Sequence, residues 1–189
     1  MGEIVKLTVK LTLICAICAG LLSLVSVKTQ KARDGIAEQK RREAAQAVLP
    51  VSDDPPVRVT LPSGQEIFET HSGTPFHLTG IAMECSSPHG YGGEIRLMVG
   101  FTADGEVIDF KVLSASETPG LGAKISSEPF RKGIRGLKTS SNWHVRKDGG
   151  DVDAITSATI SSRAVCEAIA AAAAEFPQIK AFLCGETQQ

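Results

Sequence analysis

The chain has 189 residues, of which 42% are hydrophobic and 22% are charged, and its formal net charge is -1. This near-neutral balance gives no indication of the strongly basic surface that nucleic-acid binding requires, and we expect no nucleic-acid partner. Five cysteines form an odd set without metal-ligand spacing, and the four histidines are scattered, so we expect no metal site.

The N-terminal part of the chain is strongly apolar, with an uncharged run from Leu11 to Val27. Counted back to Leu7, the run reaches the roughly 20 residues that a bilayer core requires. A cleaved signal peptide is the alternative, but no small-x-small cleavage site follows. We therefore expect residues 1–29 to form an uncleaved transmembrane anchor surrounded by membrane lipid.

Residues 30–56 are predicted to be a juxtamembrane helix and a linker. Good helix formers extend to Leu49, and the breaker cluster Ser52-Asp53-Asp54-Pro55-Pro56 marks the domain boundary. Basic residues are more numerous after the span than before it, so the positive-inside rule alone would place the following domain in the cytoplasm.

Residues 57–189 are predicted to form one domain with strands at its beginning. Short alternating segments cover Val57–Leu61, Glu66–Thr70 and Phe76–Cys85. The clearest hairpin is Gly93–Ser114, with Asp104-Gly105 as its turn. The pattern predicts an α+β fold, in which an antiparallel sheet packs against helices on one face.

The following segment adds helix and core candidates. Ser126–Lys138 is predicted to be helical and then irregular, with Phe130, Ile134 and Leu137 in the core. Trp143, the only tryptophan, lies in a strand-like segment, and a partly buried core position is favoured over stacking on a ligand.

Residues 153–162 place several hydroxyl side chains at the start of a helix that the residues from Arg163 to Phe176 continue. Side-chain oxygens at a helix start can cap unpaired N–H groups, and those groups can also bind a phosphate. From local physics alone, an ordinary N-cap is the favoured interpretation.

The run Asp-x-x-Thr-Ser-Ala-Thr-x-Ser-Ser resembles the flavinylation motif of the FMN-binding domain in the G subunit of Rnf-type ferredoxin:NAD oxidoreductases. The C subunit of the sodium-pumping NADH:quinone oxidoreductase carries a similar domain. The resemblance implies that a flavin transferase esterifies Thr159 to the phosphate of FMN, that Thr156, Ser157 and Ala158 form the motif around it, and that Asp153 is part of what the transferase recognises. Ser157 departs from the family pattern, which more often has Gly there.

A second segment matches the same family at Glu117-Thr118-Pro119-Gly120-Leu121-Gly122. By itself, this Gly- and Pro-rich loop could equally be a plain strand-to-helix connection. With the resemblance, we expect flavin contacts from the residues of the loop other than its proline, namely Glu117, Thr118, Gly120, Leu121 and Gly122. Glu117 would accept a hydrogen bond from the ring or the ribityl chain.

The resemblance implies an electron-transfer subunit with covalent FMN in a membrane-bound complex that couples ferredoxin:NAD chemistry to ion translocation. Its partners would be the other subunits of that complex. Its domain would lie on the extracytoplasmic side of the inner membrane, contrary to the positive-inside rule. The alternatives are the equivalent subunit of the sodium-pumping quinone reductase and a membrane-tethered binding or scaffold domain without a cofactor. A hydrolase using Ser161 or Ser162 lacks a recognisable base.

Overall fold

The structure is a computed structural model that describes residues 2–51, 55–72 and 77–186. Its contacts divide the chain into two units, one up to Lys40 and one from Arg41 onward. The breaker residues Ser52, Asp53 and Asp54 and part of the predicted loop at His71–Pro75 lie outside the described residues.

The N-terminal helix α1 extends from Gly2 to Val48 without interruption. Its first part is long and apolar enough to cross a membrane, as expected for a spanning helix, and the uncleaved anchor at residues 1–29 stays a prediction. We expected a span and a separate juxtamembrane helix. A single helix forms because the polar segment that follows the span consists mainly of good helix formers and contains no proline before Pro50.

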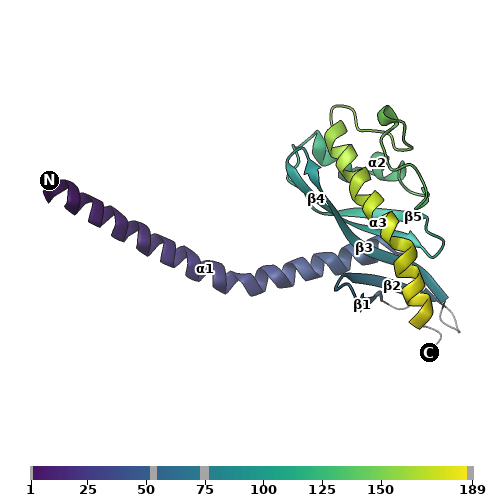
Figure 1. Ribbon diagram of the computed structural model, residues 1–189, viewed down its shortest axis with the longest axis horizontal. Helices are drawn as coiled ribbons and strands as arrows, with labels where there is room; N and C mark the ends of the chain where they lie inside the picture. The colour runs from purple at the N-terminus through teal and green to yellow at the C-terminus, as the bar shows by residue number, and fades with distance from the viewer. Residues whose placement is uncertain (1, 52–54, 73–76, 187–189) are drawn as a thin grey trace. The chain divides into compact units, whose positions relative to one another are not determined.

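The second unit contains a five-stranded antiparallel sheet, which confirms the predicted fold class (Figure 1). Its strands follow the chain order, β1-β2-β3-β4-β5. They are β1 (Val57–Thr60), β2 (Glu66–Ser72), β3 (His77–Gly90), β4 (Gly93–Thr102) and β5 (Val107–Ser114). The predicted hairpin is β4 and β5, and Gly105 adopts φ +80° in its turn.

Helix α3 (Thr159–Glu186) packs on β3 and β4 and covers one face of the sheet (Figure 1). Val165, Ile169, Ala172 and Ala173, which the helical period predicts on one face, are buried there, and so is Phe176. The helix continues through Pro177, and Ile179 and Leu183 are also buried.

The opposite face of the sheet is covered as well, by the last turns of α1. Ala44, Ala45 and Val48 are buried with Phe68 and Met98 in a second small core, so the expectation of a single packed face is wrong. The residues from Arg41 to Leu49, which we assigned to the juxtamembrane helix from sequence, pack within the second unit.

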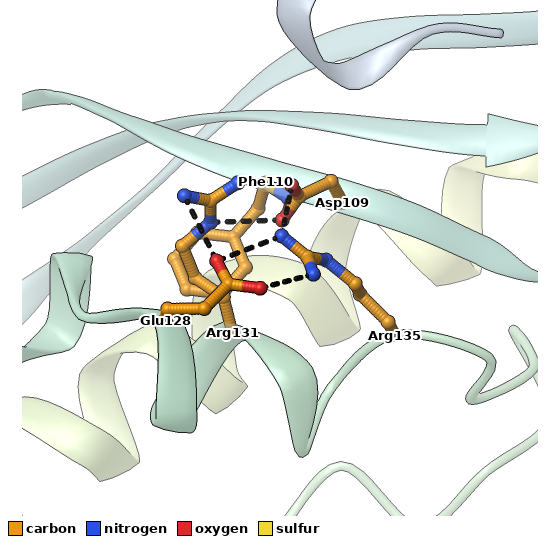
Figure 2. A network of polar contacts seen from close by, with 5 residues as sticks. All are labelled: Asp109, Phe110, Glu128, Arg131 and Arg135. Atoms are coloured by element: carbon orange, nitrogen blue, oxygen red, sulfur yellow. Dashed lines mark hydrogen bonds and ion pairs between the residues drawn. The ribbon is translucent and has the colours of Figure 1, made fainter.

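A polar network holds the short helix α2 (Glu128–Lys132) against β5 (Figure 2). Arg131 and Arg135 both donate to the carboxylate of Asp109, and Arg135 also pairs with Glu128. Burial alone would raise the pKa of Asp109, but the hydrogen bonds from the two arginines outweigh it and lower the pKa. The network fixes the segment that follows the Glu117–Gly122 loop.

The predicted core positions after this loop are confirmed. Phe130, Ile134 and Trp143 are buried in the main core, and Leu137 is partly buried against it. The strand-like segment around Trp143 forms only an isolated parallel bridge, between Val145 and Val152. All five cysteines are free thiols.

Candidate cofactor site

A cavity of about 410 Å³ lies where the start of α3 meets the loop after β5. It brings together the two segments that the sequence singled out, although they are far apart along the chain. Its lining consists of Tyr91, Glu117, Thr118, Leu121, Gly122, Ser157, Ala158, Thr159, Ile160 and Ser161. Of the predicted site residues, only Gly120 and Thr156 do not line the cavity.

The start of α3 presents N–H donors to this cavity. The first helical hydrogen bond runs from the N–H of Ser162 to the carbonyl of Ala158, at 3.0 Å. The N–H groups of Thr159, Ile160 and Ser161 precede that bond, and helix geometry leaves them without a partner inside the helix. No hydrogen bond within the described ranges uses them. The positive end of the helix dipole therefore faces a space that an anionic group can fill.

Thr159 is half-buried, and within the described residues its hydroxyl makes no hydrogen bond. From local physics alone, capping of the helix by the hydroxyls of the motif was favoured, but within the described residues the hydroxyls of Thr156, Ser157 and Thr159 make no capping hydrogen bond. The hydroxyl of Ser162 instead binds the backbone of the turn. It donates to the Ala158 carbonyl and accepts from the Ile155 N–H, both at 3.0 Å. The turn is thus held by Ser162, and the Thr159 oxygen stays available.

Ser157 is the one non-glycine residue in the described part of the chain with positive φ, at 67°. In this left-handed region a β-carbon approaches the following carbonyl oxygen, which costs roughly 1–2 kcal/mol for residues other than Gly. The departure from the family motif therefore falls at the position where the backbone itself favours glycine. The turn that aims Thr159 into the cavity is formed despite this strain.

Glu117 is buried and braces the floor of the cavity. One carboxylate oxygen accepts from the hydroxyl of Ser161 at 2.6 Å, and the other accepts from the N–H of Gly92 at 3.2 Å. Gly122 packs so closely beneath this carboxylate that a β-carbon would overlap both it and the Ser161 hydroxyl. We predicted that Glu117 would bind the flavin, and this stays a prediction. In the structure both of its oxygens bind the protein.

Two ion pairs hold the segment that leads into the helix. Arg163 donates to both carboxylate oxygens of Asp148, at 2.7 and 2.8 Å, and these hydrogen bonds lower the pKa of Asp148. Asp153 is exposed and pairs with Arg146 at 3.0 Å. A capping role for Asp153 is therefore not seen.

The residues of the cavity fit FMN in their chemistry. The N–H groups at the helix start suit a phosphate, and the exposed side chains of Tyr91, Leu121 and Ile160 suit a planar, largely apolar ring. Tyr91 and Ile160 were missed from sequence. The available signals were that Tyr91 is the only tyrosine, placed among glycines, and that Ile160 is an apolar residue within a run of hydroxyls.

A larger cavity, of about 720 Å³, does not combine these features. Most of its ionisable lining is carboxylate, from Glu66, Glu84, Glu94 and Glu175, facing Arg41 and Arg96. It includes no residue of the hydroxyl motif and no helix start. A phosphate would meet like charge there, so the smaller cavity is the better candidate for FMN.

Comparison with known proteins agrees with the geometry. Residues 90–174 match the model of the FMN-binding domain family, a range that contains both segments of the site. The G subunit of the ion-translocating oxidoreductase complex of Shewanella oneidensis is 33% identical, over 95% of this chain and 92% of that protein. The chain belongs to the family of G subunits of ion-translocating oxidoreductase complexes.

The resemblance inferred from the motifs is thereby confirmed. The G subunit of Shewanella baltica is also 33% identical, over 84% of this chain and 82% of its own length. Among solved structures, the C subunit of the Na⁺-translocating NADH-quinone reductase of Parabacteroides distasonis aligns with a TM-score of 0.54 at 18% identity, covering 72% of this chain and 88% of that one. At that identity the likeness concerns the fold alone.

Proposed function

We propose that this G-subunit homologue carries FMN esterified to the hydroxyl oxygen of Thr159. The observation that carries the proposal is the Thr159 hydroxyl itself. It has no hydrogen-bond partner among the described residues, and it lies in a cavity beside the free N–H groups of the α3 start. The relatives are named as subunits of an oxidoreductase complex, and the matched domain is described as FMN-binding.

Attachment requires an activated flavin. The Oγ1–phosphorus bond forms as the bond between the FMN phosphate and its leaving group breaks, as in a pyrophosphate-linked flavin dinucleotide that releases a nucleotide. The Thr159 proton must go to a base. No histidine lines the cavity, and Glu117 is occupied by Ser161 and Gly92. A separate flavin transferase therefore supplies the base and the activated donor.

Once attached, the phosphodiester keeps one negative charge. The N–H groups of Thr159, Ile160 and Ser161 and the dipole of α3 stabilise that charge. A charge at a helix N-terminus gains roughly 0.3–1 kcal/mol at an exposed position and up to about 2 kcal/mol when partly buried. The bound flavin supplies one-electron redox chemistry, and the protein holds its ring and shields it from water.

The proposed role is that of an electron carrier between other subunits of a membrane-bound, ion-translocating complex, and it is not a complete enzyme alone. A membrane position is supported by the one helix, among the described residues, that is long and apolar enough to span a bilayer. We further propose that the domain lies on the extracytoplasmic side of the inner membrane. A membrane-impermeant maleimide should then label the exposed Cys184 in intact spheroplasts. Labelling only after lysis would mean that the domain lies in the cytoplasm.

The experiment is in-gel fluorescence of the full chain, co-expressed with a flavin transferase and separated under denaturing conditions. Wild type should give a fluorescent band, and Thr159→Val should not, although it keeps the size and branching of the side chain. Thr60→Val is the matched control, since it makes the same change at an exposed threonine of β1 that lies outside both segments of the site. It should keep the flavin on the tryptic peptide that contains Thr159.

A wild-type band without flavin would support the cofactor-free scaffold instead. A fluorescent band from Thr159→Val would show that FMN is attached to a residue other than Thr159. The equivalent subunit of a sodium-pumping quinone reductase is the alternative assignment within the same chemistry, and the identity of the co-purifying subunits would distinguish it.

A further inference from the structure

The rim of the FMN cavity contains an unusual concentration of exposed apolar side chains. Among the described residues from Arg41 onward, five large hydrophobic side chains are exposed, and three of them line this cavity: Tyr91, Leu121 and Ile160. They are 69%, 45% and 48% exposed, respectively. Exposed apolar residues that gather around a cavity usually mark a binding surface.

The three side chains come from three different elements. Tyr91 is at the tip of the hairpin between β3 and β4, Leu121 lies in the loop before the short 3-10 helix η1 (Gly122–Ser126), and Ile160 is in the first turn of α3. Their gathering is therefore a property of the tertiary structure and not of one apolar stretch of sequence.

The backbone at Tyr91 is held firmly although its side chain is exposed. On one side, the N–H of Gly92 donates to Glu117, and a β-carbon at Gly92 would overlap the carbonyl of Ser116. On the other side, a β-carbon at Gly90 would overlap the carbonyl of Gly93 and press on Glu117. The hairpin tip is thus packed against the loop after β5, and the aromatic ring starts from a fixed point at the cavity rim.

We propose that Tyr91 packs its ring on the isoalloxazine of the bound FMN, with Leu121 and Ile160 as further apolar contacts. This inference rests on the proposed function. An exposed aromatic ring that gains a planar partner is stabilised by the stacking contact in addition to the apolar area that it buries. Tyr91 is a positioning residue in this role, because it orders the flavin ring that the phosphodiester alone would leave free to rotate.

The test uses the emission of the flavin attached to the full-length chain, since a stacked phenol quenches flavin fluorescence. Denaturant separates the ring from the protein, while the phosphodiester keeps it attached. The ratio of folded to unfolded emission is therefore independent of how much flavin is loaded. Tyr91 is the only tyrosine, so Tyr91→Phe removes the oxidisable phenol and keeps the ring.

We expect the wild-type ratio to be well below one, because the phenol stacked on the flavin ring quenches its emission. The ratio of Tyr91→Phe should be at least about twofold higher, because phenylalanine can still stack on the flavin but has no phenol. Val57→Ala is the matched control. Val57 is also exposed but does not line the cavity, and its ratio should equal that of wild type.

Equal ratios for wild type and Tyr91→Phe, with flavin present in both gel bands, would overturn the stacking contact and leave the attachment at Thr159 intact. A wild-type band without flavin would reject the proposed function, and the stacking contact with it.

Discussion

Replacement of Ser157 by glycine should stabilise the folded domain. The φ of 67° at this residue costs roughly 1–2 kcal/mol for a side chain with a β-carbon. Glycine removes that cost but gains backbone freedom in the unfolded chain, which returns about 0.5–1 kcal/mol. The net effect is an increase of about 0.5–1 kcal/mol in the free energy of unfolding. For a domain of this size, that corresponds to a rise of about 1–4 °C in Tm.

The assay is thermal unfolding of the full chain in detergent, followed by the fluorescence of Trp143. This residue is the only tryptophan and is buried in the main core, so its signal reports on the second unit. Ser157→Ala keeps the β-carbon and should leave Tm near the wild-type value, because within the described residues the Ser157 hydroxyl makes no hydrogen bond.

Ser127→Gly is the second control, because the same chemical change is made at φ -72°. It should lower Tm slightly, since glycine gains entropy in the unfolded chain and relieves no strain there. If Ser157→Gly lowered Tm as Ser127→Gly does, Ser157 would not have the strained left-handed conformation described here.

Three further outcomes follow from the described contacts. Glu117→Ala should lower the free energy of unfolding by about 2–4 kcal/mol in chemical denaturation, because it leaves the Ser161 hydroxyl without its buried acceptor; a loss below about 0.5 kcal/mol would contradict the bracing role. The folded-state pKa of Asp109 is lowered, so its stabilising contribution is present above its unfolded pKa of about 3.9 and is lost as pH falls through the folded value. Asp109→Asn should therefore flatten the acid decline of stability below about pH 4, and an unchanged profile would contradict this. Burial raises the pKa of the Cys166 thiol to about 12, so at pH 8 iodoacetamide should modify the exposed Cys184 and reach Cys166 only in denaturant, as peptide mass analysis would show.

Much of the fold could be predicted because its signals are local. Strand alternation and the Asp104-Gly105 turn located the β4–β5 hairpin, and helical periodicity located the buried side of α3. The role of Arg41–Leu49 could not be predicted in this way. Its alanines resemble those of any solvated helix, and only the tertiary structure shows that they pack under Phe68 and Met98.

The candidate site was likewise predicted where its signals are local and missed where they depend on the tertiary structure. The two loops were found through their motifs, but which hydroxyl binds inward and which stays free depends on the turn at Ser157 and on Ser162. Tyr91 was missed because its proximity to the site comes from packing of the hairpin tip on the loop after β5, and no local pattern encodes that contact.

If FMN is attached at Thr159 as proposed, the hydrogen bonds of Glu117 have a consequence for the order of folding and attachment. One carboxylate joins the chain at Gly92, 25 positions away, and at Ser161, 44 positions away. The surroundings of Thr159 therefore come into existence only when the hairpin, the loop and the helix have all assembled. An enzyme that recognises this assembled surface would modify finished domains and pass over nascent or misfolded chains, so folding would come first and the cofactor second.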